Sequence, residues 1–231
     1  MSDVPARHDL ALTLPWLAAG TARLVDALDA ADLAAPSGLP GWSGAHLAAH
    51  LTGNAEALRR LVAWGRTGIE TAMYATPEAR TAEIETDARL AHERLRARVR
   101  QSAAALDEDL GAVSDWTAQV RSARGRVIPL LELPWMRVRE VWLHAVDATP
   151  GATVDLLPGA LQDTLLEDVA GSYADRPATP RLVLQVGDRR WDLGSEGPPQ
   201  QVAATREQAL GWLTGRPSPD PRELPAVPPW L

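Results

Sequence analysis

The stretch Glu140-Val141-Trp142-Leu143-His144 decides how this chain is interpreted, because it sets a carboxylate and an imidazole four residues apart. The surrounding sequence predicts a helix that begins at Pro134 and ends near Ala148. Side chains four residues apart lie one above the other on the same face of a helix. Glu140 and His144 are therefore expected to point in the same direction from one helix.

Two side chains make a poor metal site, and a third ligand from a facing helix would complete it. His50 lies on a second predicted helix, which begins after an N-cap at Ser43 and ends near Trp64. Two histidines and a glutamate with an open fourth position are typical of a catalytic zinc site, whereas structural zinc sites are closed by four protein ligands. His50, Glu140 and His144 are thus candidate metal ligands.

Each candidate also has an ordinary structural interpretation. His144 could be a core histidine, and an exposed helical Glu140–His144 pair remains an alternative, although glutamate is almost never fully buried without a partner. His46 shares the helix face of His50 and is a rival ligand. We prefer His50 because His46 falls in the first turn, closer to solvent, where it could line the rim of the site. His8 and His92 are expected on the surface.

Composition limits the chemistry that the chain can perform. The 231 residues carry a net charge of −7, which does not favour nucleic-acid binding. All 23 basic residues are arginine, so lysine Schiff-base chemistry is excluded. There is no cysteine, so a metal must be held by His, Asp or Glu, and a sulfur nucleophile must come from another molecule. Without a signal pattern or a long apolar run, we expect a cytoplasmic protein that binds no membrane.

The first 149 residues predict a four-helix bundle with inward-facing metal ligands. Its first helix is expected from about Asp9 to Asp32, with a regular part that starts at Pro15. Gly65 and Gly68 are expected to end the second helix. Thr76-Pro77-Glu78 predicts the start of a third helix that runs to about Leu106. Between Thr117 and Leu133, a turn at Gly125 indicates a hairpin or an irregular crossover.

Residues 150–231 predict a smaller C-terminal α/β domain, so that the whole chain has an α+β fold. A helix is expected near Pro158–Ala174, followed by strands at Arg181–Val186 and Arg190–Leu193 and a further candidate strand at Gln201–Ala204. Thr205–Thr214 predicts a short helix that Gly215 closes. The proline-rich tail beyond it is expected to be extended.

A set of short segments in the first 150 residues forms a specific combination, although each segment alone is common. They are Leu39-Pro40-Gly41-Trp42-Ser43, His46-Leu47-Ala48-Ala49-His50-Leu51 with Asn54, Trp64-Gly65-Arg66-Thr67-Gly68, Met73-Tyr74-Ala75 and Arg139–Asp147. Together they resemble the DinB-like, mycothiol-dependent maleylpyruvate isomerase family. The similarity continues weakly into the second domain through Trp212-Leu213-Thr214-Gly215-Arg216.

The resemblance implies a metal-binding bundle with a C-terminal α/β domain, and zinc and mycothiol as cofactors. It assigns the zinc ligands to His50, Glu140 and His144, and a catalytic arginine to Arg216, with Arg206 as the alternative. The implied reaction converts maleylpyruvate to fumarylpyruvate. A zinc-bound thiol is deprotonated; its addition makes the cis double bond single, and rotation and thiol expulsion return it trans. Arginine would stabilise the enolate and bind the carboxylates.

Two alternatives to the isomerase remain open at this point. A mycothiol S-transferase would use the same metal and thiol and would differ in its substrate pocket. A non-enzymatic metal-binding or regulatory bundle would use neither thiol nor substrate. The Met73-Tyr74 segment favours the isomerase by resemblance. The expected partners are a small-molecule substrate and the thiol cofactor, and the chain is expected to be a monomer.

Overall fold

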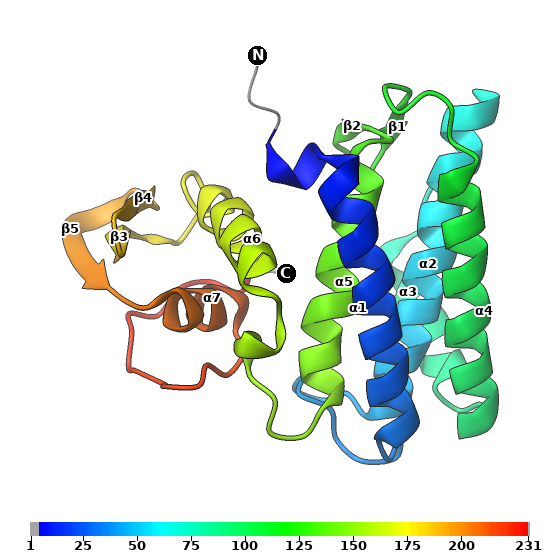
Figure 1. Ribbon diagram of the computed structural model, residues 1–231, viewed down its shortest axis with the longest axis horizontal. Helices are drawn as coiled ribbons and strands as arrows, with labels where there is room; N and C mark the ends of the chain where they lie inside the picture. Colours follow the sequence, from blue (N-terminus) through cyan, green and yellow to red (C-terminus); the bar gives the residue numbers. More distant parts are fainter. Residues whose placement is uncertain (1–4, 231) are drawn as a thin grey trace. The chain divides into compact units, whose positions relative to one another are not determined.

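A computed structural model describes residues 5–230, and the chain divides into two compact units at Pro150 and Gly151. The first unit is a four-helix bundle, and the second is a smaller unit with helices and one sheet (Figure 1). The predicted α+β fold, with an N-terminal bundle and a smaller C-terminal α/β part, is confirmed.

Four long helices build the bundle, with α1 against α5 and α2 against α4. A short helix, α3, packs on α2, and a 3-10 turn, η1, precedes α1 (Figure 1). The bounds are η1 Ala6–His8, α1 Leu10–Ala30, α2 Gly44–Thr67, α3 Pro77–Asp87, α4 His92–Gly111 and α5 Glu132–Ala148.

Helix α1 starts close to the predicted Asp9, but its regular part begins before Pro15 because Asp9 caps it. The Asp9 carboxylate accepts a hydrogen bond from the Ala11 N–H at 2.9 Å, so the helix begins at Leu10 and continues through Pro15. A proline within a helix removes one backbone hydrogen bond. The buried stripe that includes Leu17, Leu24 and Leu28 packs this helix into the bundle and stabilises it past the interruption.

Helix α2 ends at Gly68 and not at Gly65. Gly68 has a left-handed backbone (φ 73°) and donates its N–H to the Trp64 carbonyl, which is a common helix C-terminus. Gly65 lies inside the helix against Leu130, where an added Cβ would be only 2.6 Å from a Leu130 methyl carbon. Gly65 therefore serves close packing.

The predicted third helix is two helices, α3 and α4, separated by a turn at residues 88–91. Thr76 caps α3 as expected, through its side-chain oxygen and the Ala79 N–H. Arg98 of α4 reaches back to Asp87 at the end of α3, with an N–O distance of 2.7 Å. The long, charged segment thus folds back on itself, and α3 is free to lie across α2.

The segment before α5 forms a hairpin of β1 (Gln119–Arg121) and β2 (Val127–Pro129), with Gly125 (φ 77°) in the turn. This confirms the hairpin and excludes the irregular crossover. Helix α5 begins at Glu132, two residues before Pro134.

The sheet of the second unit has the strand order β4-β3-β5. Strand β3 is antiparallel to β4 and parallel to β5. The candidate third strand is therefore present. Tyr173 joins the tail to the last helix, because its hydroxyl lies 3.0 Å from the Leu213 carbonyl and 2.9 Å from that of Pro228. The bounds are η2 Val154–Leu156, α6 Gly159–Ser172, β3 Pro180–Val186, β4 Arg189–Leu193, β5 Glu196–Ala203 and α7 Arg206–Thr214.

Candidate metal centre

Helices α2 and α5 bring His50, Glu140 and His144 together, with one potential ligand atom of each within 4.8 Å of the others. Glu140 Oε2 lies 2.9 Å from His50 Nε2 and 3.3 Å from His144 Nε2. Ligands at about 2.0–2.2 Å from a tetrahedral zinc ion lie roughly 3.4 Å from one another. The three side chains are therefore spaced as a small divalent metal requires.

The three side chains differ in burial and in charge. Both histidines are buried, whereas Glu140 is partly exposed. Burial would raise the pKa of Glu140, but attraction to His50 and hydrogen bonds from both histidines outweigh it and hold that pKa well below its usual range. Burial lowers the pKa of His50, against the opposing effect of Glu140. An ionised carboxylate beside a neutral imidazole is the donor chemistry that binds a metal.

His144 has an outer partner that suits a metal ligand. Its Nδ1 lies 2.8 Å from Oδ2 of the buried Asp147. A carboxylate there accepts the ring N–H, which leaves Nε2 free for a metal. Burial would lower the pKa of His144, but the hydrogen bonds to Asp147 and Glu140 outweigh it and raise that pKa.

The loop before α2 packs directly on Asp147 and His50, which explains why the sequence of this loop is distinctive. Gly38 donates its N–H to the Asp147 carbonyl at 2.8 Å, and a Cβ at Gly38 would be 3.0 Å from the Asp147 Cα. The Trp42 ring meets the His50 ring edge-on, with centroids 5.4 Å apart. The loop thus holds one outer partner and one ligand in place.

Arg137 is a functional candidate that the sequence analysis missed. It is fully buried on α5, and Nη1 donates to the Leu51 carbonyl at 3.0 Å and to Asn54 Oδ1 at 2.7 Å, both on α2. Burial lowers the pKa of Arg137 to about 10, against the attraction of Glu140. Among the described residues, its Nη2 has no hydrogen-bond partner. Arg137 therefore fixes α2 against α5 beside the candidate ligands.

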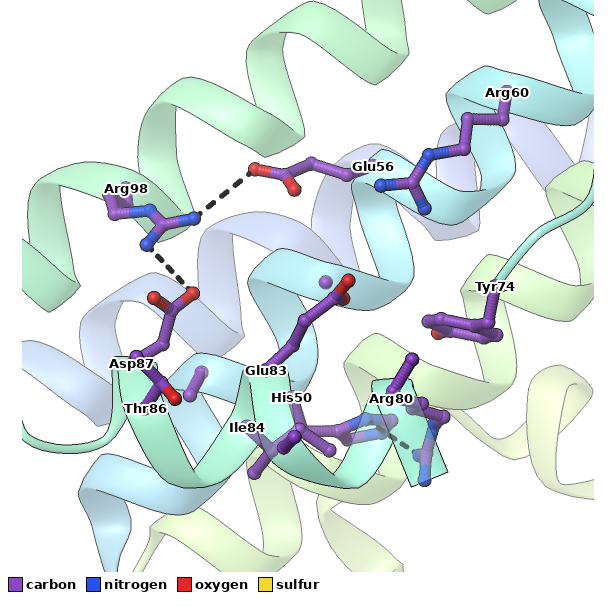
Figure 2. Close-up of a pocket in the computed structure, with 14 residues that line it drawn as sticks. His50, Glu56, Arg60, Tyr74, Arg80, Glu83, Ile84, Thr86, Asp87 and Arg98 are labelled. Carbon is purple, nitrogen blue, oxygen red and sulfur yellow. Dashed lines mark hydrogen bonds and ion pairs between the residues drawn. The ribbon is translucent and has the colours of Figure 1, made fainter. Parts of the chain in front are cut away.

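A cavity of about 470 Å³ opens beside His50, and it is lined by α2, α3, the segment that carries Tyr74, and Arg98 of α4 (Figure 2). Arg80, in the first turn of α3, brings Nη2 to 3.0 Å from His50 Nδ1 and lies over the Tyr74 ring at 5.6 Å. Arg60 also lines the cavity and donates to the Met73 carbonyl at 2.6 Å. Sequence reasoning missed both arginines.

The rival histidine has a different role in the structure. His46 Nδ1 lies 2.8 Å from Ser43 Oγ and accepts the Ser43 N–H, so His46 caps α2. Its Nε2 lies 3.6 Å from Glu85. His8 contacts Glu132, and His92 is at the start of α4. Only His50, of the two histidines on the shared face, joins the metal group found among the described residues.

The two candidate arginines of the second unit both have local partners. Arg216 follows α7, and its Nη1 donates to the Thr214 carbonyl at 2.7 Å. Arg206, at the start of α7, pairs with Asp163 at 3.2 Å and with Glu207 at 2.9 Å. Arg216 thus has the hydrogen bond expected of an arginine that follows a helix C-terminus, whereas Arg206 takes part in a surface ion-pair network.

A family model described as the mycothiol maleylpyruvate isomerase N-terminal domain matches residues 15–149. The chain belongs to this family. A crystal structure of the mycothiol-dependent maleylpyruvate isomerase matches it with a TM-score of 0.89 and 33% identity, over 96% of this chain and 97% of that chain. A histidine-to-alanine mutant of that enzyme matches with a TM-score of 0.87 and 32% identity, over the same shares. No curated protein gave a significant match.

The predicted family resemblance is thereby confirmed across nearly the whole chain. Across residues 5–230, no helix combines the length and the apolar character that crossing a membrane requires.

Proposed function

We propose that the protein is a zinc- and mycothiol-dependent isomerase that converts maleylpyruvate to fumarylpyruvate. The observation that carries this proposal is the meeting of His50, Glu140 and His144 in a member of this family. Their side chains fit a metal, because a carboxylate with a lowered pKa lies between two imidazoles and Asp147 fixes the tautomer of one of them.

A bound metal would supply a thiolate at neutral pH from a thiol such as mycothiol, which is the nucleophile that this cysteine-free chain lacks. His50, Glu140 and His144 would hold the metal at one side of the cavity. Asp147 and the Trp42 ring keep the two imidazoles in position. Arg137 keeps α2 and α5 in register, so that the ligands on the two helices stay within reach of one ion.

The charges around the site favour an anionic substrate. Near the ligands, the negative charges of Glu140 and Asp147 are matched by the positive charges of Arg80 and Arg137, two against two. A divalent ion would therefore leave an excess of positive charge, which suits a thiolate and a dicarboxylate. This favours the isomerase over a transferase that acts on a neutral electrophile.

Arg216 is proposed to bind a substrate carboxylate and to stabilise the enolate, as the family resemblance implies. A guanidinium matches the planar carboxylate with two parallel hydrogen bonds. The Arg216 side chain is half-buried, and its Nη1 donates to the Thr214 carbonyl.

The proposal is tested by metal analysis together with turnover of maleylpyruvate with and without mycothiol. We expect about one zinc per chain, and isomerisation only when both metal and thiol are present. Full activity in dialysed, thiol-free protein would remove the thiol mechanism. Thiol consumption with formation of a stable conjugate would identify an S-transferase, and a metal-loaded protein that acts on neither substrate class would be a binding protein.

A further inference from the structure

The outer partners of the two candidate histidine ligands have opposite hydrogen-bonding character. His144 Nδ1 faces a carboxylate oxygen of Asp147, which can only accept when ionised. His50 Nδ1 faces a guanidinium nitrogen of Arg80 at 3.0 Å, and a guanidinium can only donate. Nδ1 of His144 must therefore donate an N–H, whereas Nδ1 of His50 must accept one.

A neutral imidazole has one N–H group and one lone pair. In His144 an N–H on Nδ1 donates to Asp147, so Nε2 is the nitrogen that binds a metal once its proton is displaced. In His50 the lone pair of Nδ1 accepts from Arg80, so the N–H is on Nε2 and donates to Glu140 Oε2 at 2.9 Å. The nitrogen of His50 that faces the other ligands therefore has no lone pair to give a metal in this arrangement.

We propose that Arg80 blocks His50 in the metal-free protein, and that metal binding releases Arg80 into the adjoining cavity as a binding group for the carboxylate of an anionic ligand. This rests on the proposed function, because it requires the metal to bind His50 through Nε2. With the metal in place, the N–H of His50 moves to Nδ1, and two donors then face each other. Arg80 must turn away.

The cavity offers the released guanidinium a place beside a second cation. Arg80 lies at the same end of the cavity as Tyr74, with Arg60 on α2 also lining the wall (Figure 2). At the other end, Arg98 pairs with Asp87 at 2.7 Å and with Glu56 at 3.5 Å (Figure 2). Arg98 is thus occupied by two carboxylates, which leaves Arg60 and Arg80 as the cations suited to an incoming carboxylate.

This arrangement couples the two binding events. Without metal, a carboxylate competes with His50 for Arg80; with metal, that competition is gone. The coupling is reciprocal, so a bound dicarboxylate also strengthens metal binding by the same factor. One hydrogen bond to a charged group corresponds to about 10-fold in an equilibrium constant. We therefore expect Zn²⁺ and the dicarboxylate each to strengthen the binding of the other by about this factor.

The test measures binding alone, by calorimetric titration of metal-free protein with Zn²⁺ and of metal-free and Zn²⁺-loaded protein with maleate. Arg80→Met removes the donor that blocks His50, so Zn²⁺ should bind about 10-fold tighter than in wild type. Maleate should bind the loaded variant about 10-fold more weakly. The gain in maleate affinity that Zn²⁺ causes in wild type should shrink by a similar factor.

Arg60→Met is the matched control, because it removes a cavity cation that does not contact His50. Its Zn²⁺ affinity should equal that of wild type, and Zn²⁺ should still strengthen maleate binding, although maleate binds more weakly overall. Unchanged or weaker Zn²⁺ binding in Arg80→Met would overturn the inference, since Arg80 would then be neutral or supportive toward the metal-bound His50. If wild type itself binds no Zn²⁺, the proposed function fails instead.

Discussion

The candidate metal ligands of the first unit and Arg216 of the second are held in different ways. His50, Glu140 and His144 come from two helices, and each contacts another side chain of the group or its outer partners. Arg216 donates to a carbonyl only two residues before it. The candidate metal group therefore lies within the first unit, whereas the role proposed for Arg216 belongs to the second. Variants that separate metal binding from turnover test this difference.

The largest effect is expected from the ligands themselves. His144→Ala should lose nearly all bound zinc and all turnover, because a metal held by two remaining side chains is held poorly. His46→Ala is the matched control and should retain its metal, with only a small loss of stability from the weakened cap of α2. Metal analysis after dialysis decides the matter. Stoichiometric zinc in His144→Ala, or its loss in His46→Ala alone, would show that the ligands are wrongly assigned.

The second effect concerns Arg216 and should leave the metal untouched. Arg216→Lys is expected to lower kcat/KM by roughly 30- to 1,000-fold, which corresponds to about 2–4 kcal/mol, because one ammonium cannot reproduce two parallel hydrogen bonds. Zinc content and thermal stability should stay at wild-type values. Arg206→Lys is the control and should keep its turnover. If the Arg206 variant alone loses activity, the catalytic arginine has been misplaced.

A third effect sharpens the comparison within the first unit, between a buried and an exposed arginine. Arg137→Met removes the two hydrogen bonds that Arg137 donates to the Leu51 carbonyl and to Asn54 on α2. We expect a loss of about 2–4 kcal/mol in the free energy of unfolding, with weaker zinc binding. Arg100→Met removes an exposed pair with Asp29 and should cost about 0–1 kcal/mol. Denaturant unfolding of metal-free protein compares the two, and equal losses would mean that Arg137 does not join the helices.

Sequence periodicity was sufficient to predict that His50, Glu140 and His144 meet, because each of them lies on a regular helix. The spacing of Glu140 and His144 fixed their common face, and the Ser43 cap fixed the register of His50. The spacing did not predict Arg80 in the site, because the break between α3 and α4 has neither glycine nor proline to mark it. Without that break, Arg80 belongs to a long solvated helix.

Arg137 was missed for a different reason. Its partners lie more than 80 residues away in the sequence, and an arginine on a predicted helix is normally expected to be exposed to solvent. A weak signal was present, because Arg137 precedes Glu140 by three residues and Asn54 follows His50 by four. Each polar residue thus shares the face of a ligand. Two such pairs on facing helices could have indicated a polar link beside the metal group.

The smallest effect is a pH dependence of the metal-free protein, and its sign follows from the raised pKa of His144. A group whose pKa is higher in the folded state stabilises that state when protonated. This contribution is fully present below the unfolded value of about 6.5 and is lost as the pH rises through the folded value. Glu140, with its lowered pKa, contributes in the opposite range, above its unfolded value of about 4.5.

The comparison of wild type with His144→Gln isolates the contribution of His144 to the pH dependence of stability, since both proteins keep His50 and Glu140. Between about pH 5.5 and 8.5, the stability advantage of metal-free wild type should shrink as the pH rises. Zinc-loaded wild type should show the reverse, because protons compete with the metal for its ligands and stability then increases with pH. Thermal unfolding across this range, in chelator and in excess zinc, measures both. An advantage that grows with pH in the metal-free proteins would show that Asp147 and Glu140 do not hold the His144 proton.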